Sequence, residues 1–234
     1  MRSYLIVDDN VAFAENLAEI LTDAGAKVDV AAGGEAAIEH VRTTRYDALI
    51  SDMRMPVMGG AELVHRVRRL DPGLPAIVIT AYTNDDELQA ARQEGLLAVL
   101  SKPPPVDRLL ELCAGARRDG LVVLIEDDLA LSDNLSELLR SRGFAAVTAG
   151  SVLETERLGD VRPFAALVDL RVAGGPDGAA MSSLARKYPH LPMLVVTGHH
   201  DVTPPEAHAG IHHKPFNSAA LLAAVEELHA SRHA

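Results

Sequence analysis

Short apolar runs alternate along the chain with longer segments in which apolar residues recur every three or four positions. The runs are rich in Val, Ile, Leu and Ala, as is typical of parallel strands that are covered on both faces. The longer segments predict amphipathic helices. In the first half, this pattern predicts strands at 5–7, 28–31, 48–50, 76–79 and 97–100, and helices near 11–23, 34–43, 59–69, 84–94 and 104–117.

The second half repeats this alternation. It predicts strands at 121–125, 144–148, 165–168, 193–196 and around 211, with helices near 129–142, 151–158, 178–188 and 216–231. A repeat of this length in 234 residues favours two domains, which we place at 1–118 and 119–234. Five β-α pairs in each predict an α/β fold with a doubly wound parallel sheet and right-handed crossovers.

Each half also carries five polar residues that follow its predicted strands. The two sets are Asp8, Asp9, Asp52, Thr80 and Lys102, and Glu126, Asp127, Asp169, Thr197 and Lys214. Because the carboxyl ends of parallel strands meet at one edge of a sheet, we expect each set to converge in one pocket. Carboxylates are the ligands that Mg²⁺ prefers, and lysine and threonine can bind phosphoryl oxygens. The sequence therefore predicts a Mg²⁺ and phosphoryl site in each half.

A carboxylate in such a pocket can attack phosphorus and form an aspartyl phosphate. The approach of two anions is unfavourable, and a divalent metal held by neighbouring carboxylates offsets the repulsion. Crowding of Asp8, Asp9 and Asp52 is expected to raise the pKa of at least one of them in the metal-free protein. We therefore expect an affinity for Mg²⁺ that weakens in acid.

The stretch Asp52-Met53-Arg54-Met55-Pro56-Val57-Met58-Gly59-Gly60 resembles the phosphoacceptor loop of response-regulator receiver domains. The run Ile77-Val78-Ile79-Thr80-Ala81-Tyr82 and the pair Lys102-Pro103 resemble later motifs of that family. The resemblance covers residues 1–118 and implies a flavodoxin-like (βα)5 fold with strand order 2-1-3-4-5.

The resemblance also implies roles for the residues of the first site. Asp52 is expected to be the phosphoacceptor, and the implied Mg²⁺ ligands are Asp8, Asp9, Asp52 and the carbonyl of Arg54. The donor is expected to be a phosphohistidine on a sensor histidine kinase or a histidine phosphotransfer protein.

Thr80 is implied to be the switch hydroxyl, and Lys102 to pair with the phosphoryl group. The family usually has an aromatic residue three positions before this lysine. Val99 stands there in the first half, and Ile211 in the second. The usual coupling of threonine to an aromatic side chain therefore cannot operate in its standard form.

Residues 121–231 resemble the same family through Glu126-Asp127, Asp169-Leu170-Arg171, Val195-Val196-Thr197-Gly198 and Lys214-Pro215-Phe216. By this resemblance, Asp169 is the second candidate acceptor, with Thr197 and Lys214 beside it. The implied metal ligands are Glu126, Asp127, Asp169 and the carbonyl of Arg171.

The second half departs from the family in two ways. Val172-Ala173 replaces the Met-Pro pair after the acceptor, and the gap from Thr197 to Lys214 is shorter than the gap from Thr80 to Lys102. The shorter gap contains Pro204-Pro205, which predicts that the fourth helix is short or missing. Phosphorylation of Asp169 is therefore left open.

The net charge of −11 is shared as −6 in residues 1–119 and −5 in residues 120–234. Neither half has the basic face that nucleic-acid binding requires. The basic run Arg66, Arg68 and Arg69 is interpreted as the solvated face of a helix. No run is long enough to be a signal peptide or a membrane span, so we expect a cytoplasmic protein without a membrane partner.

These observations favour a two-component response regulator with two receiver domains and no DNA-binding output domain. Its signal would pass to a downstream protein partner, and a homodimer is one assembly that it could form. The first alternative is the receiver portion of a larger hybrid kinase or cyclase. The second is a phosphotransfer enzyme that turns over an outside substrate. Such phosphatases usually carry a second aspartate two residues after the nucleophile, where this chain has Arg54 and Arg171. We therefore do not expect a turnover enzyme.

Overall fold

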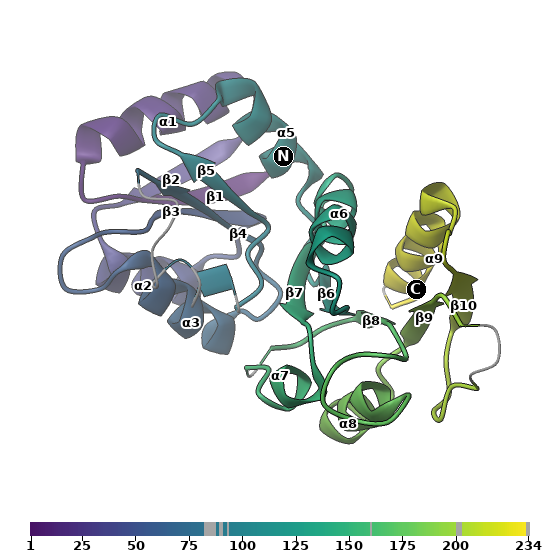
Figure 1. Ribbon diagram of the computed structural model, residues 1–234. Helices are drawn as coiled ribbons and strands as arrows, with labels where there is room; N and C mark the ends of the chain where they lie inside the picture. Colours follow the sequence, from purple (N-terminus) through teal and green to yellow (C-terminus); the bar gives the residue numbers. More distant parts are fainter. Residues whose placement is uncertain (82–87, 89–90, 93, 160, 200–202, 233–234) are drawn as a thin grey trace. The chain divides into compact units, whose positions relative to one another are not determined.

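The computed structural model describes residues 1–81, 88, 91–92, 94–159, 161–199 and 203–232. The chain forms two compact units, residues 1–119 (unit 1) and 120–234 (unit 2). Each unit consists of one parallel sheet with helices on both faces (Figure 1).

Unit 1 contains a five-stranded sheet in the order β2-β1-β3-β4-β5. Its strands are β1 (Ser3–Val7), β2 (Lys27–Ala31), β3 (Ala48–Asp52), β4 (Ala76–Thr80) and β5 (Ala98–Ser101). Helices α1 (Val11–Asp23) and α5 (Val106–Gly115) cover one face, and α2 (Gly34–Thr43) and α3 (Gly60–Leu70) cover the other (Figure 1). The helix expected at 84–94 lies mostly outside the described residues, of which 88, 91 and 92 are helical.

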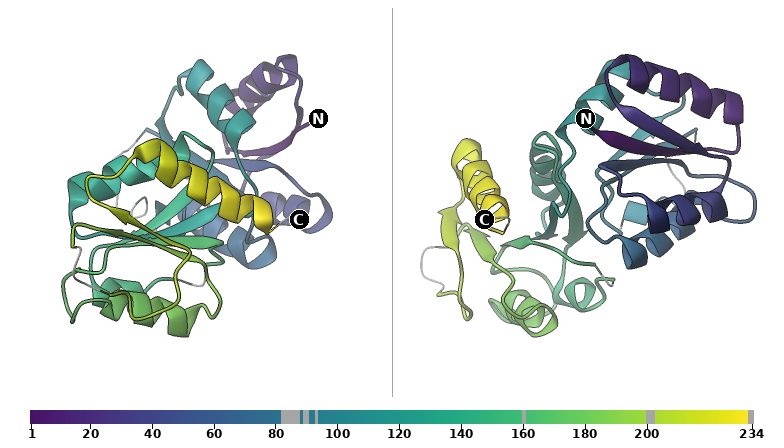
Figure 2. Two further views of the ribbon diagram at one scale, coloured as in Figure 1. Left: turned by 90° about the vertical axis from the view of Figure 1, so that its right-hand side faces the viewer. Right: turned by 180° about the vertical axis from the view of Figure 1, so that it is seen from behind.

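Unit 2 repeats this order as β7-β6-β8-β9-β10. Its strands are β6 (Leu121–Ile125), β7 (Ala145–Ala149), β8 (Ala165–Val168), β9 (Met193–Thr197) and β10 (Gly210–His213). Helices α6 (Leu129–Arg140) and α9 (Ser218–Ser231) cover one face, and α7 (Val152–Glu156) and α8 (Ala179–Lys187) cover the other (Figure 2). The predicted fold class is thus confirmed in both units.

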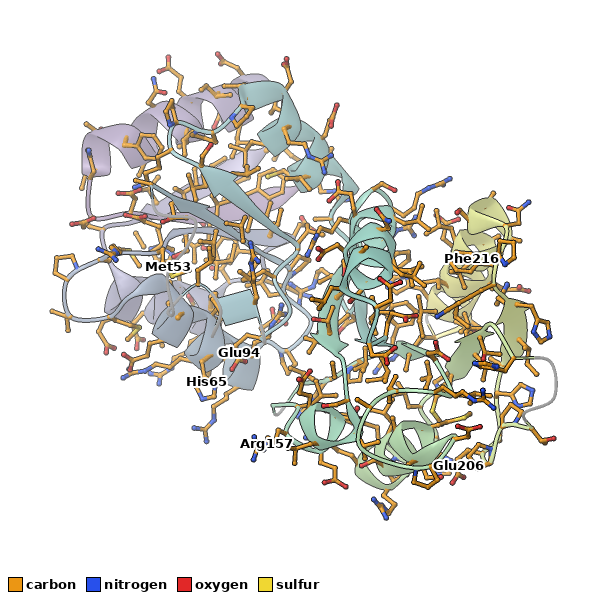
Figure 3. The ribbon with its side chains drawn as sticks, viewed as in Figure 1. Met53, His65, Glu94, Arg157, Glu206 and Phe216 are labelled. Atoms are coloured by element: carbon orange, nitrogen blue, oxygen red, sulfur yellow. The ribbon has the colours of Figure 1, made fainter. Side chains whose placement is uncertain are left out.

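The stretch between β9 and β10 differs from its counterpart in length and in form. Residues 203–209 contain no helix, while 200–202 lie outside the described residues. Glu206, labelled in Figure 3, accepts a hydrogen bond of 3.0 Å from the hydroxyl of Ser182 on α8. Gly178 packs against this stretch, because a Cβ there would lie 2.6 Å from Cδ of Pro205.

The central strands of both parallel sheets are buried along their whole length. Every residue of β3, β4, β6 and β9 is buried, since helices cover both faces of these strands. In unit 2, Phe216 (Figure 3) packs against the core that lies between the sheet and the helices α6 and α9. No helix among the described residues is both long enough and apolar enough to span a membrane.

The interpretation of the basic run as a solvated face is wrong for Arg68. Arg68 is only 5% exposed, and burial lowers the pKa of its guanidinium to about 10. The guanidinium donates hydrogen bonds to the carbonyl oxygens of Glu94 (3.0 Å), Pro72 (3.0 Å), Leu74 (2.6 Å) and Gly95 (2.7 Å). Arg68 therefore joins the loops that lead into β4 and β5. Nδ1 of His65 on α3 lies 3.0 Å from Oε1 of Glu94 (Figure 3).

We predict that Arg68→Met destabilises unit 1 by about 3 kcal/mol, because buried carbonyl groups lose their donors. Arg69→Met, at the exposed neighbouring position, should cost less than about 0.5 kcal/mol. Urea unfolding followed by circular dichroism measures both changes. Equal losses from the two substitutions would contradict the structural role of Arg68.

Candidate functional site

The carboxyl ends of four strands bring the first predicted set together. Asp52 and Thr80 are the last residues of β3 and β4, Asp8 follows β1, and Lys102 follows β5. Asp8 and Asp52 are only 3% and 9% exposed, which is unusual for carboxylates unless they are paired. The backbone N–H of Lys102 donates to the carbonyl of Thr80 at 2.9 Å, which fixes the lysine at the end of the sheet.

The Lys102 ammonium bridges the two buried carboxylates. Its Nζ lies 2.7 Å from Oδ2 of Asp8 and 2.9 Å from Oδ2 of Asp52. Burial lowers the pKa of Lys102, but its hydrogen bonds and ion pairs with both aspartates outweigh this effect, and the net pKa is raised. The ring of Phe13 lies 4.8 Å from Nζ and limits the positions that the ammonium can take.

Backbone donors orient the remaining carboxylate oxygens. Oδ1 of Asp8 accepts the N–H of Asn10 at 2.9 Å, and Oδ1 of Asp52 accepts the N–H of Met53 at 2.7 Å. The Asn10 side chain in turn caps α1 by accepting the N–H of Phe13 at 3.2 Å. The first carboxylate is thereby linked to the start of α1.

Gly60 allows the acceptor loop to close tightly on β3. Its N–H donates to the carbonyl of Met53 at 2.7 Å. A Cβ at position 60 would lie 2.4 Å from the carbonyl oxygen of Asp52, which no side chain can tolerate without a shift of the backbone. Glycine is therefore required for α3 to begin beside the acceptor.

The donor set in unit 1 suits a hard divalent cation. Asp8, Asp9 and Asp52 each place a carboxylate oxygen within 4.8 Å of the others. Asp9 is exposed, so a cation bound here could keep several waters, as Mg²⁺ prefers. The carbonyl of Arg54 belongs to the same loop, two residues after Asp52.

Unit 2 repeats this arrangement around Lys214. Its Nζ lies 2.6 Å from Oε2 of Glu126 and 2.6 Å from Oδ2 of Asp169. The carboxylate oxygens of Glu126, Asp127 and Asp169 lie within 4.8 Å of one another. Burial raises the pKa of Glu126, which the ion pair with Lys214 offsets only in part. The backbone N–H of Lys214 donates to the carbonyl of Thr197 at 2.8 Å, as its counterpart does in unit 1.

The acceptor loop of unit 2 has an additional contact that the sequence did not reveal. The Arg171 guanidinium donates to Oδ2 of Asp177 at 2.9 Å and contacts the His199 ring, with Nη1 3.0 Å from Nδ1. The backbone N–H of His199 donates to the Thr197 hydroxyl at 3.3 Å. Only the carbonyl of Arg171 entered the predicted site, since a surface arginine has no sequence pattern that identifies its partners.

We predict that Lys102→Met destabilises unit 1 by about 2 kcal/mol near neutral pH, because two buried carboxylates lose their counter-ion. The raised pKa keeps the ammonium charged at neutral pH. The difference in free energy of unfolding between wild type and Lys102→Met should therefore stay constant between about pH 6 and 9. It should then shrink as the pH rises through the folded-state pKa, above the ordinary value of 10.5.

Urea unfolding at several pH values measures this difference, with the exposed Lys27→Met as a control that should have little effect. If the difference in free energy of unfolding between wild type and Lys102→Met disappeared between about pH 6 and 9, the assigned ion pair would be contradicted.

Comparison with known proteins bears on the identity of the chain. Residues 4–114 match the family model described as the response regulator receiver domain. A response regulator receiver protein of Anaeromyxobacter sp. (strain Fw109-5) is 63% identical over 232 residues, which is 99% of this chain and 97% of that protein. The transcriptional regulatory protein ZraR of Klebsiella oxytoca is 33% identical over 105 residues, covering 45% of this chain and 24% of that protein.

Among solved structures, chemotaxis protein CheY4 of Vibrio cholerae is 34% identical, with a TM-score of 0.45, covering 47% of this chain and 93% of that chain. The whole-length match to the Anaeromyxobacter protein is the finding that decides the family. The chain belongs to the response regulator receiver proteins of two-component signalling.

Proposed function

We propose that unit 1 accepts a phosphoryl group on Asp52 from a phosphohistidine of a sensor histidine kinase or histidine phosphotransfer protein. The observation that carries this proposal is the Lys102 ammonium between Asp8 and Asp52, beside a cluster of three carboxylates. This arrangement combines a candidate nucleophile, a mobile cation and a set of Mg²⁺ ligands at one edge of the sheet.

In this reaction, an oxygen of the Asp52 carboxylate forms a bond to phosphorus while the bond between phosphorus and the donor imidazole nitrogen breaks. Bound Mg²⁺ would offset the charge of the carboxylate and of the phosphoryl oxygens. Asp8 and Asp9 hold the metal, together with Asp52 and the carbonyl of Arg54. Lys102 releases Asp52 and binds a phosphoryl oxygen, and the Thr80 hydroxyl donates to another.

We further propose that unit 2 is a second, divergent receiver domain with Asp169 as its acceptor. The support is the repeated strand order and the repeated lysine bridge, here between Glu126 and Asp169. Asp127 and the carbonyl of Arg171 complete its metal ligands, and Thr197 and Lys214 take the roles of Thr80 and Lys102.

The output of these two units is a change in affinity for a protein partner rather than for DNA. Phosphorylation shifts an existing equilibrium by ordering the loops around the threonine and the lysine. Arg54 and Arg171 stand two residues after the acceptors, where an acid would be needed to expel a leaving group. We therefore propose a signalling protein that is phosphorylated and dephosphorylated on its own aspartates, without turnover of an outside substrate.

We predict that acetyl phosphate with Mg²⁺ adds two phosphoryl groups to the wild-type protein. Asp52→Asn and Asp169→Asn should each accept one group, and the double variant none. Intact-mass measurement at short reaction times counts the groups directly. Omission of Mg²⁺ is the matched control and should leave all four proteins unmodified.

Two outcomes separate the parts of this proposal. Modification of the double variant to the wild-type level would contradict the assignment of both acceptors. A single group on wild type that persists in Asp169→Asn would restrict the function to unit 1.

The raised pKa of Glu126 leads to a prediction for unit 2. A proton on Glu126 competes with the metal, so Mg²⁺ affinity should fall as the pH is lowered through this pKa, by up to about tenfold per pH unit below it. Calorimetric titration of the Asp9→Asn, Asp52→Asn variant confines the measurement to unit 2. Equal affinity at about pH 7.5 and at pH 4.5, the ordinary pKa of a glutamate, would contradict the assignment, and Glu126→Gln should weaken the dependence.

A further inference from the structure

Unit 2 has a groove at the amino ends of its strands, opposite the carboxyl ends where the Lys214 site lies. The groove measures about 530 Å³ and lies among the loop before β8, the loop before β9 and the carboxyl end of α9. Phe164, Leu191 and Leu228 contribute apolar surface, and Pro163, Pro189 and Pro192 stiffen the two loops. Its size falls in the range of functional binding sites in proteins.

Unit 1 provides an internal comparison for this groove. Residues 71–75 lead into β4 with the sequence Asp-Pro-Gly-Leu-Pro, and residues 188–192 lead into β9 with Tyr-Pro-His-Leu-Pro. Each stretch follows the third helix of its unit directly and ends one residue before the strand begins. The two loops therefore occupy equivalent places in the two folds.

In unit 1, residues 116–119 of the chain itself occupy the equivalent place at the amino ends of the strands. Helix α5 ends at Gly115, and residues 116–119 cross to the loop before β4. The Arg118 guanidinium pairs with both carboxylate oxygens of Asp71, at 2.6 and 2.7 Å, and donates to the carbonyl of Tyr46. The backbone N–H of Asp119 donates to the carbonyl of Gly73 at 2.9 Å. A segment that turns at Arg118 and Asp119 is thus held by one ion pair, one hydrogen bond from a side chain to a backbone carbonyl and one backbone hydrogen bond.

The corresponding edge of unit 2 lacks such a segment among the described residues. Helix α9 continues to Ser231 instead of ending early, so Leu228, Ser231 and Arg232 form one wall of the groove. Tyr188 stands where unit 1 has Asp71, and the acid that would attract an arginine is missing. His190 stands where unit 1 has Gly73, and it lines the groove.

The charges that line the groove are of one sign. Arg162, Lys187 and Arg232 contribute to it together with His190, and no Asp or Glu is found among its described lining residues. Unit 2 as a whole has 9 basic and 14 acidic side chains, so three of its nine cations gather here. Lys187 and Arg232 lie at the carboxyl ends of α8 and α9, where cations also offset the helix dipole. Arg162 has no such explanation, since it lies in the loop before β8.

We propose that this groove of unit 2 binds an acidic peptide segment of a partner protein. Carboxylates of the segment pair with Arg162 and Arg232, and an apolar side chain packs against Tyr188 and Leu228. A backbone N–H of the segment donates to the carbonyl of His190, as the N–H of Asp119 does to Gly73 in unit 1. The segment held in unit 1 favours a peptide over a small molecule, and the reversed charge favours an acidic one.

The proposal does not depend on phosphorylation, because the groove lies at the opposite end of the strands from Asp169. Fluorescence anisotropy tests it on the whole chain of 234 residues. The probe is a fluorescein-labelled peptide that alternates Glu with Val and includes one Phe. The matched control probe replaces each Glu with Lys.

We expect the acidic peptide to bind wild type and the lysine peptide not to bind. Arg162→Ser with Arg232→Ser should weaken the acidic peptide by about tenfold, since two ion pairs are lost. Arg186→Ser is the control in the same unit, because Arg186 has a side chain that is 74% exposed and does not line the groove. Affinity for the acidic peptide should also fall as salt is added.

Failure of the acidic peptide to bind wild type, or equal binding by the double variant and wild type, would overturn the proposal. Tighter binding of a single-stranded oligonucleotide of the same charge, lost in the double variant, would also overturn it in favour of a nucleic-acid partner. Thermal unfolding of each variant confirms that the surface substitutions leave the fold intact.

Discussion

In each unit, a single lysine ammonium lies between two largely buried carboxylates that are contributed by different strands. Without this cation, the carboxylates would repel one another in a place that water barely reaches. The lysine therefore stabilises the fold and also lies in direct contact with the candidate acceptor of each unit. Because a phosphoryl group would bring new negative charge, the same ammonium can move from the carboxylate to a phosphoryl oxygen without leaving the pocket. Stability and chemistry thus depend on one interaction.

The residues that surround the lysine and its two carboxylates differ between the two units. Unit 1 places the ring of Phe13 near the ammonium, and Gly60 closes the acceptor loop tightly. Unit 2 has Glu126 in place of an aspartate, and its loop is joined through Arg171 to His199 beside Thr197. Residues 203–209 contact α8 without forming a helix. The geometry around the lysine is thus repeated in the two units, while the loops around it differ.

The sequence predicted the strands because buried parallel strands carry nearly continuous apolar runs, as at 121–125 and 165–168, whereas their order came from the family resemblance. It also predicted which polar residues converge, since strand ends are fixed by the topology. Element ends were less predictable: α5 ends at Gly115 because the chain turns to bring Arg118 onto Asp71, a contact between distant residues. Arg68 was misjudged for the same reason, because its carbonyl partners come from loops that only the folded chain brings near.

The groove in unit 2 distinguishes it from unit 1. Neither its lining residues nor its charge forms a motif in the sequence. It becomes visible when the edge that residues 116–119 occupy in unit 1 is compared with the edge that α9 borders in unit 2. Unit 2 thus repeats the lysine bridge at the carboxyl ends of its strands while the amino ends form a groove.

We propose that the carboxylate paired with the lysine carries the phosphoryl group. Borohydride reduction of the protein after transfer from a phosphohistidine donor, followed by peptide mapping, tests it most directly, because an aspartyl phosphate is reduced to homoserine. The account predicts homoserine at position 52 when Mg²⁺ is present and none when the metal is chelated. Phosphate retained on a serine, threonine or histidine, with aspartate unchanged at position 52, would contradict it.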